Sequence, residues 1–235
     1  MEKYFDAKYI GDSFPMLIPY ITVTFQVAFL SVLFGTLLGF VLAAMKLGSS
    51  KFGKIIANGY TTALRCTPSI VLLFLVYYGI PAIADHFGVN LDNVDKIFFI
   101  VITFSLQFAA VMSEVIRSAY SSIDKGQFEA AVSVGLSNTQ AYWRIILPQA
   151  LVVALPNFGN SLLELIKEGS LAYTIGLIDV MGKASLIIDG RFNAHALETY
   201  IALSVIYWVI SIVIEQLFLK LERIFSKGKQ VIKTT

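Results

Sequence analysis

Few side chains in this 235-residue chain are charged, and cysteine and histidine are scarcer still. Asp, Glu, Lys and Arg make up 14% of the residues, against about a quarter in a soluble domain. The single cysteine, Cys66, excludes an intrachain disulfide. The histidines, His86 and His195, lack the spacing of metal ligands, and no nucleophile lies beside a candidate base. A phosphate-binding Gly-x-x-x-x-Gly-Lys-Ser/Thr loop is also missing, so we expect neither a catalytic centre nor a nucleotide site in this chain.

Apolar residues are what the chain has in abundance. They make up 57% of it, and the mean hydropathy is +0.73. The net charge of +2 is too small to indicate a nucleic-acid partner. Residues 1–15 mix acidic and basic side chains and lack the pattern of a cleaved signal peptide. We therefore predict an all-α membrane protein with one domain, residues 1–235, whose membrane bundle covers about 19–219.

Five segments approach the length of about 20 apolar residues that a helix needs to cross a bilayer. They are residues 21–45, 55–84, 97–119, 150–166 and 197–219, and the second is broken at Thr67-Pro68 and ends at Pro81. Small residues recur at every fourth position of the first segment and predict close packing on another helix: Ser31, Gly35, Gly39 and Ala43. Residues 171–188 are interrupted by glycine and charged residues, so we expect them to be re-entrant or folded against the bundle.

The placement of basic residues predicts the orientation, because Lys and Arg accumulate in cytoplasmic loops. The loop after the first segment contains Lys46, Lys51 and Lys54. The loop at residues 85–96 instead has three Asp and one Lys, and the chain ends in a basic tail made of Lys220, Arg223, Lys227, Lys229 and Lys233. With five spans, we expect the amino terminus outside and the carboxy terminus inside.

Residues 124–148 form a polar interruption on the inner side of this topology. Asp124 is a typical N-cap residue, with Gln127 three positions later as in a capping box. Gly135 is expected to end that first helix in a left-handed conformation. Ser137 and Gln140 repeat the capping pattern for a second helix, which should end at Pro148.

The same segment resembles the EAA signature of binding-protein-dependent ABC importer permeases, which reads E-A-A, three residues, G, nine residues, I-x-L-P. The matching positions are Glu129, Ala130, Ala131, Gly135, Ile145, Leu147 and Pro148. The resemblance implies a type I ABC importer transmembrane fold in the bacterial cytoplasmic membrane, with this loop as the cytoplasmic coupling helix in a groove of an ABC ATPase subunit. That partner would bind ATP and Mg²⁺. A second permease subunit and an extracytoplasmic solute-binding protein are the other implied partners. The alternative is an ordinary surface hairpin of two helices.

Two further stretches resemble the polar amino acid branch of these permeases. Residues 65–81 are similar to its R-G-T-P…Y-Y-G-x-P pattern, with Cys66 in place of the usual glycine. Residues 160–172 are similar to N-S-L…K-D-T-S-L-A, with Glu168 for Asp and Gly169 for Thr. The resemblance implies a polar amino acid as the solute, and residues 190–196 resemble cystine-type members.

Ionisable residues inside the third and fourth segments are candidates for a substrate path, because a charge at membrane depth usually faces a cavity or a partner. The candidates are Gln107, Glu114 and Arg117 on one helix and Ser161, Glu164, Lys167 and Glu168 on the other. Together they offer both signs of charge, as a zwitterionic amino acid requires. The pairs Glu114–Arg117 and Glu164–Lys167 could instead be structural ion pairs between residues three positions apart.

Three other functions are compatible with a membrane bundle. A permease for another small solute would share the EAA signature but not the two amino acid stretches. An autonomous secondary transporter would show inverted repeats, of which the sequence has no trace. An integral membrane enzyme would need a catalytic cluster, which is missing.

Overall fold

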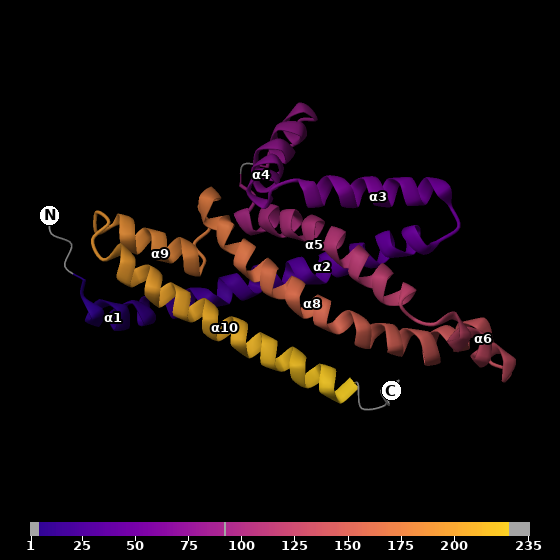
Figure 1. Cartoon of the computed structure of the whole chain (residues 1–235). Helices are drawn as coiled ribbons and strands as arrows, with labels where there is room; N and C mark the ends of the chain where they lie inside the picture. The colour runs from indigo at the N-terminus through magenta and orange to yellow at the C-terminus, as the bar shows by residue number, and fades with distance from the viewer. Residues whose placement is uncertain (1–4, 92, 226–235) are drawn as a thin grey trace.

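The computed structural model of the chain describes residues 5–91 and 93–225, and these residues form helices and connecting turns without any strand (Figure 1). The α-helices are α1 (Ala7–Leu17), α2 (Ile21–Leu47), α3 (Lys51–Cys66), α4 (Ser69–His86), α5 (Lys96–Ser121), α6 (Lys125–Ser133), α7 (Asn138–Ala141), α8 (Leu147–Gly169), α9 (Val180–Asp189) and α10 (Ala196–Phe225). Helices α2, α5, α8 and α10 run along the length of the molecule, with α1 and α9 at one end and α6 at the other.

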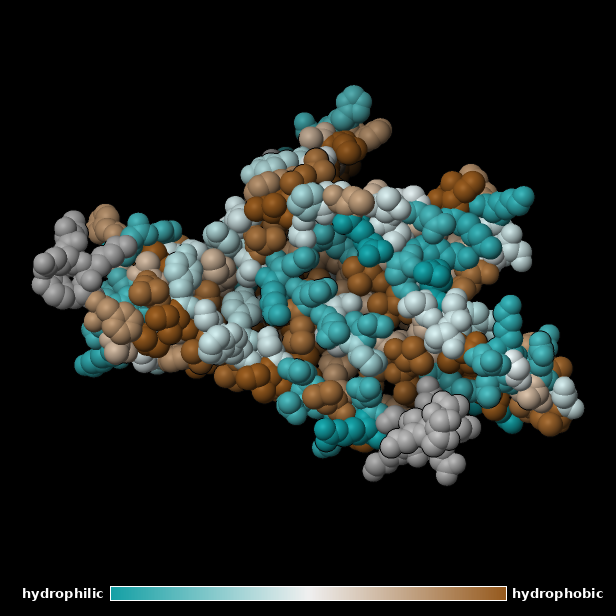
Figure 2. Space-filling view, in the orientation of Figure 1, coloured by the Kyte–Doolittle hydropathy of each residue, from teal (hydrophilic) through white to brown (hydrophobic). Residues whose placement is uncertain are grey.

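Five helical segments are long and apolar enough to cross a membrane. They are Ala7–Leu47, Ser69–His86, Lys96–Ser121, Asn138–Ile175 and Ala196–Phe225. Figure 2 shows hydrophobic residues over much of the bundle, with hydrophilic ones gathered between α3 and α8 and at the α6 end. The predicted all-α membrane fold with five spans is confirmed. Of the basic tail, Lys220 and Arg223 lie in the last turns of α10, whereas residues 227, 229 and 233 lie outside the described part.

Close packing of α2 on α5 forms the centre of the bundle. A Cβ atom added to Gly35 would lie 2.9 Å from Phe108 Cβ, and one added to Gly39 would lie 2.7 Å from Met112 Cβ. Real Cβ atoms do not approach so closely, so only glycine fits at these two positions. Ser31 and Ala43, which continue the stripe, are 0% and 1% exposed. The predicted small-residue contact is therefore confirmed, with α5 as its partner.

The second predicted span is divided at Thr67-Pro68, as expected. Helix α3 ends at Cys66, and α4 begins at Ser69 and is the part that can span a membrane. The prediction that Pro81 ends this helix is wrong, because α4 continues past it to His86. An internal proline removes one backbone donor, and the residues that follow it still bond to earlier carbonyls.

Residues 171–188 contain no helix long enough to cross a membrane. They form a 3₁₀ segment (Ser170–Ile175), a turn at Gly176 with φ +83°, and the ten-residue helix α9. Ten residues of α-helix span only about 15 Å, half of a bilayer core. The Asp179 carboxylate caps α9 by accepting a 2.8 Å hydrogen bond from the Gly182 backbone N–H, and the Thr24 hydroxyl donates to it at 3.3 Å. The expectation that this stretch folds against the bundle agrees with the packing of α9 on α10 and α1.

The helical hairpin at residues 124–148 differs from its prediction at Gln127 and, as described below, at Pro148. Gly135 does have φ +93°, and Ser137 and Gln140 form a full capping box, as predicted. The Asp124 carboxylate caps α6 through the Gly126 N–H at 2.6 Å, but Gln127 bonds to the Gln149 side chain instead of completing a second box.

Pro148 does not end a helix, so that prediction is wrong. The chain passes from α7 through a π-helical turn (Tyr142–Ile146) into α8, with Pro148 in the first turn of α8. The Leu147 N–H bonds to the Tyr142 carbonyl, five residues back. A π turn admits one additional residue directly before the proline ring, so the helix continues where a regular α-helix would clash.

Candidate functional site

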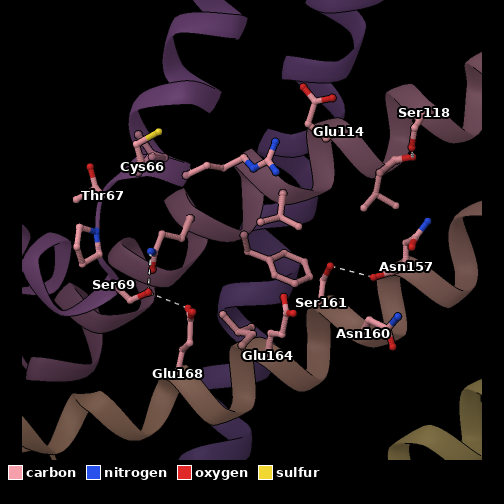
Figure 3. Close-up of a pocket in the computed structure, with 18 residues that line it drawn as sticks. Cys66, Thr67, Ser69, Glu114, Ser118, Asn157, Asn160, Ser161, Glu164 and Glu168 are labelled. Carbon is pink, nitrogen blue, oxygen red and sulfur yellow. Dashed lines mark hydrogen bonds between the residues drawn. The ribbon is translucent and has the colours of Figure 1, made fainter.

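A cavity of about 820 Å³ opens between the α3–α4 corner, α5 and α8 (Figure 3). Its wall is rich in polar side chains, which is unusual for the interior of an apolar bundle. These are Arg65, Cys66, Thr67, Ser69, Gln107, Glu114, Ser118, Asn157, Asn160, Ser161, Glu164 and Glu168. The break at Thr67-Pro68 brings this corner of the chain to the cavity, so the interrupted helix shapes one side of it.

Charges of both signs face the cavity without compensation. Arg65 supplies the positive charge, and Glu164 and Glu168 supply negative charge from α8. Within the part of the chain that the structure describes, none of these three side chains forms an ion pair. Charged side chains inside a membrane bundle usually face a cavity or a partner, and these three line the cavity.

A chain of hydrogen bonds fixes one side of the cavity (Figure 3). The Gln107 side-chain amide donates to the Ser69 hydroxyl at 2.9 Å, and Ser69 donates to a Glu168 carboxylate oxygen at 2.9 Å. These bonds connect α5 to the first turn of α4 and then to α8. The residue that follows the helix break is therefore hydrogen-bonded to both α5 and α8.

Glu114 forms ion pairs with two basic side chains. Its Oε1 atom lies 2.7 Å from Lys46 Nζ, and its Oε2 atom lies 2.8 Å from the Arg117 guanidinium. Lys46 also donates to the hydroxyls of Thr61 and Ser113. Lys46 is thus buried in the last turn of α2, and the prediction that it is a loop lysine is wrong. Its stem is covered by α3 and α5, and sequence position alone does not show that enclosure.

The hairpin at residues 124–148 presents an apolar surface at the far end of the molecule. Val134 and Trp143 are 80% and 67% exposed. Within the hairpin, the Phe128 ring packs on Tyr142 with centroids 5.0 Å apart, and the Tyr120 hydroxyl of α5 donates to the Tyr142 hydroxyl at 3.3 Å. The end of α5 is therefore joined directly to the π turn that leads into α8.

Comparison with known proteins identifies the family. Residues 35–227 match the family described as binding-protein-dependent transport system inner membrane component. The chain belongs to this family. The L-cystine transport system permease protein TcyL of Bacillus subtilis (strain 168) is 42% identical over 234 residues, 100% of this chain and 97% of that protein. The histidine/lysine/arginine/ornithine transport system permease protein HisQ of Salmonella typhimurium is 31% identical, over 88% of this chain and 91% of that protein.

A solved structure agrees with this membership. A chain of the crystal structure of an amino acid ABC transporter with histidines is 30% identical and superimposes with a TM-score of 0.80, covering 94% of this chain and 99% of that one. The expected likeness to ABC importer permeases, with a type I transmembrane fold, is confirmed. This chain is a multi-pass membrane subunit of that family.

The permease places the predicted path residues in two groups. Gln107, Glu114, Ser161, Glu164 and Glu168 line the cavity, whereas Arg117 and Lys167 do not. The Glu114–Arg117 ion pair exists, and no Glu164–Lys167 pair occurs among the described residues.

The polar residues of the cavity wall that sequence reasoning missed include Arg65, Ser69, Asn157 and Asn160. For two of them the sequence contained a signal. Arg65 begins the R-x-T-P stretch, and Asn160 directly precedes Ser161 in the N-S-L stretch. Ser69 and Asn157 had no such signal, because only the packing of three separate helices brings them to the wall.

Proposed function

We propose that this permease moves a polar amino acid, with L-cystine as the first candidate, through the cavity between the α3–α4 corner, α5 and α8. The observation that carries the proposal is the pair of opposite, uncompensated charges on its wall. The Arg65 guanidinium suits an α-carboxylate, and Glu164 or Glu168 suits an α-ammonium group. The names of TcyL and HisQ, both permeases for amino acids, support this solute class.

The predicted path residues take different parts in this proposal. Glu164 and Glu168 contact the solute, and Gln107 and Ser161 provide neutral hydrogen-bonding groups beside them. Glu114 joins α5 to α2 through Lys46 at the edge of the path, and Arg117 binds its other carboxylate oxygen, so neither is assigned to solute contact. Lys167 lies outside the cavity wall and contributes positive charge near its rim.

The energy for transport comes, in this proposal, from an ABC ATPase subunit that binds ATP and Mg²⁺. The coupling helix that docks in its groove comprises Glu129, Ala130, Ala131 and Gly135, with Ile145, Leu147 and Pro148 leading into α8. Exposed Val134 and Trp143 supply an apolar contact on that surface. ATP-driven closure of two ATPase subunits would pull on this hairpin, and the Tyr120–Tyr142 contact would pass the movement to α5 and α8.

The complete importer contains a second permease subunit, identical or homologous, and an extracytoplasmic solute-binding protein that delivers the amino acid. Residues 1–235 act as one transmembrane domain in the bacterial cytoplasmic membrane. The amino terminus lies outside and the coupling hairpin and carboxy terminus lie inside. Five spans and the basic residues Lys51, Lys54 and Lys220 support this orientation.

The experiment is uptake by the complex reconstituted in proteoliposomes with its ATPase and solute-binding protein. We expect ATP-dependent uptake of labelled L-cystine, reduced about tenfold by Arg65→Gln and by Glu168→Gln while complex yield is unchanged. Lys54→Gln, an exposed charge on the same helix as Arg65, is the matched control. Uptake without the ATPase would instead indicate a secondary transporter, and ATP-dependent uptake of a solute that is not an amino acid would overturn the proposed substrate.

A further inference from the structure

The hydroxyl of Ser69 lies between two polar side chains that belong to different helices (Figure 3). Its oxygen accepts a 2.9 Å hydrogen bond from Gln107 Nε2 on α5, and it donates one of 2.9 Å to Glu168 Oε2 on α8. An ionised carboxylate can only accept, so the direction of both bonds is fixed. Ser69 donates its one proton to Glu168, and the NH₂ group of Gln107 must face Ser69.

The orientation of the Gln107 amide follows from this chain of bonds. Because its nitrogen is turned to Ser69, its oxygen, Oε1, is turned away. That oxygen is buried and accepts no hydrogen bond from any residue that the structure describes. A buried acceptor without a donor is unfavourable, and native proteins rarely leave one unpaired. Gln107 lines the cavity, so a donor group on the solute can pair with it.

Glu168 is held more firmly than Glu164, one helical turn before it. Both lie on the same face of α8 and line the cavity. Among the described residues, the Glu164 carboxylate has no polar partner, whereas Ser69 fixes one oxygen of Glu168 and leaves the other, Oε1, free. A side chain that is already fixed loses less conformational freedom when it binds a ligand. Glu168 is therefore the better prepared acceptor for a cationic group.

The position of Ser69 in the chain explains why its hydroxyl is available for this contact. Helix α4 begins at Ser69, directly after Pro68, and has no side-chain cap. Serine hydroxyls often bond to the backbone of their own helix, as Ser161 does at the Asn157 carbonyl. Ser69 instead bonds across the cavity to α5 and α8. The break in the second span thus supplies a polar group that joins two other helices.

We propose that Ser69 is a positioning residue for the ammonium group of the solute. It holds Glu168 and Gln107 so that their free oxygens together accept hydrogen bonds from one ammonium group, which has three N–H donors. Both polar groups lie 2.9 Å from the same hydroxyl oxygen, which places them close enough to share a ligand. This rests on the proposed function, and it assigns the ammonium group to Glu168 where that function leaves Glu164 and Glu168 as alternatives. Ser69 itself does not touch the solute.

The test is equilibrium binding to the permease–ATPase complex in nanodiscs, without the solute-binding protein, so that the cavity alone selects the solute. The probes are labelled L-cystine and labelled 3,3′-dithiodipropionate, which retains both carboxylates and the disulfide but has no ammonium group. For Ser69→Ala, we expect the Kd of L-cystine to rise about tenfold and that of dithiodipropionate to stay unchanged. Ser69→Thr retains a hydroxyl and should bind L-cystine nearly as well as the wild type does. Ser204→Ala, which removes an exposed hydroxyl that bonds within α10, is the matched control and should bind both probes as wild type.

A double variant shows whether Ser69 acts through Glu168. Because the two residues form one unit, Ser69→Ala should cause little further loss of L-cystine affinity in a Glu168→Gln background. Independent losses that multiply would overturn the positioning role. Equal losses of affinity for both probes, together with a lower melting temperature, would show that Ser69 only holds the helices together. Wild-type affinity of Ser69→Ala for L-cystine would also overturn the proposal. Absence of L-cystine binding and of amino acid uptake in the wild-type complex would instead contradict the proposed function itself.

Discussion

Lys46 Nζ lies 2.7 Å from Glu114 Oε1, which joins the last turn of α2 to the C-terminal half of α5. The lysine side chain is only 2% exposed, and the glutamate also binds Arg117. Thr61 on α3 accepts a further hydrogen bond from Lys46. Three helices therefore meet at a single buried cation at the edge of the cavity, and removing it should affect assembly more than solute recognition.

Replacing Lys46 tests that role. Lys46→Met leaves Glu114 with one cation instead of two in a half-buried position, so we expect about 2 kcal/mol lower stability of the purified complex. The measurement is thermal unfolding in detergent together with complex yield. The double variant Lys46→Met/Glu114→Gln should recover part of the loss, because it removes the unpaired charge as well. Lys51→Met, an exposed lysine, is the control, and an equal loss there would contradict a specific role for Lys46.

Gly135→Val should disrupt the coupling hairpin. A β-branched residue is strained at φ +93°, at a cost of about 1–3 kcal/mol, which would distort the turn between α6 and α7. We expect reduced co-purification of the ATPase subunit and a sharp loss of uptake. Gly59→Val provides the same substitution where no heavy atom lies within 4 Å of the added Cβ and φ is ordinary. Normal co-purification and uptake by Gly135→Val would show that this turn is not needed for coupling.

Gly39→Val should separate α2 from α5. Its Cβ alone would lie 2.7 Å from Met112 Cβ, and the backbone carbonyl of Ala109 is 3.3 Å away. Overpacking of this kind lowers stability by about 1–3 kcal/mol, or prevents assembly. The melting temperature of the complex measures it. At Gly79 the added Cβ meets nothing within 4 Å, so Gly79→Val should melt close to wild type. A wild-type melting temperature for Gly39→Val would mean that the two helices do not pack at this distance.

Asp179 should make stability depend on pH. Burial raises the pKa of its carboxyl to about 6 in the folded protein, above its ordinary value near 3.8. The folded state therefore binds the proton more tightly than the unfolded state. The stabilisation that comes from protonated Asp179 is complete below about pH 4. It is lost as the pH rises through 6, which lowers the free energy of unfolding by up to about 3 kcal/mol.

The measurement is the melting temperature of wild type and Asp179→Asn between pH 5 and pH 7. Asn retains a cap for α9 but does not titrate, so the wild type should gain more stability at pH 5 than the variant does. Other carboxylates titrate in both proteins and cancel in the difference. Parallel curves would show that Asp179 is not buried as an isolated acid.

The orientation is tested by labelling single cysteines in a Cys66→Ala background. Asn193, in the loop between α9 and α10, should react from outside with a membrane-impermeant maleimide once replaced by cysteine. Asn138, at the start of α7, should react only after the cells are opened. Both side chains are exposed, so accessibility within the protein does not limit either reaction. Labelling of position 138 in intact cells would reverse the proposed topology.

The sequence by itself determined the class of molecule and the position of its main elements. Apolar run length fixes the spans, because a bilayer core sets a minimum of about 20 helical residues. The spacing of Gly35 and Gly39 predicted a helix contact, since residues four apart share one helix face. The hairpin with Gly135 was recognisable because capping and left-handed turns depend on local residues.

Only the tertiary structure decided which polar residues meet. The sequence predicted that Lys46 lies in a loop, but in the structure it is part of a buried hydrogen-bond network, because α3 folds back over it. Ser69 is hydrogen-bonded to Gln107, 38 positions away in the sequence, and to Glu168, 99 positions away. Helix periodicity relates only residues a few positions apart, so it could not predict these contacts. The helix runs on through Pro148 because a π turn precedes this residue. Local rules predict elements, but the pairing of side chains across elements follows from the packing angles and depths that the whole bundle sets.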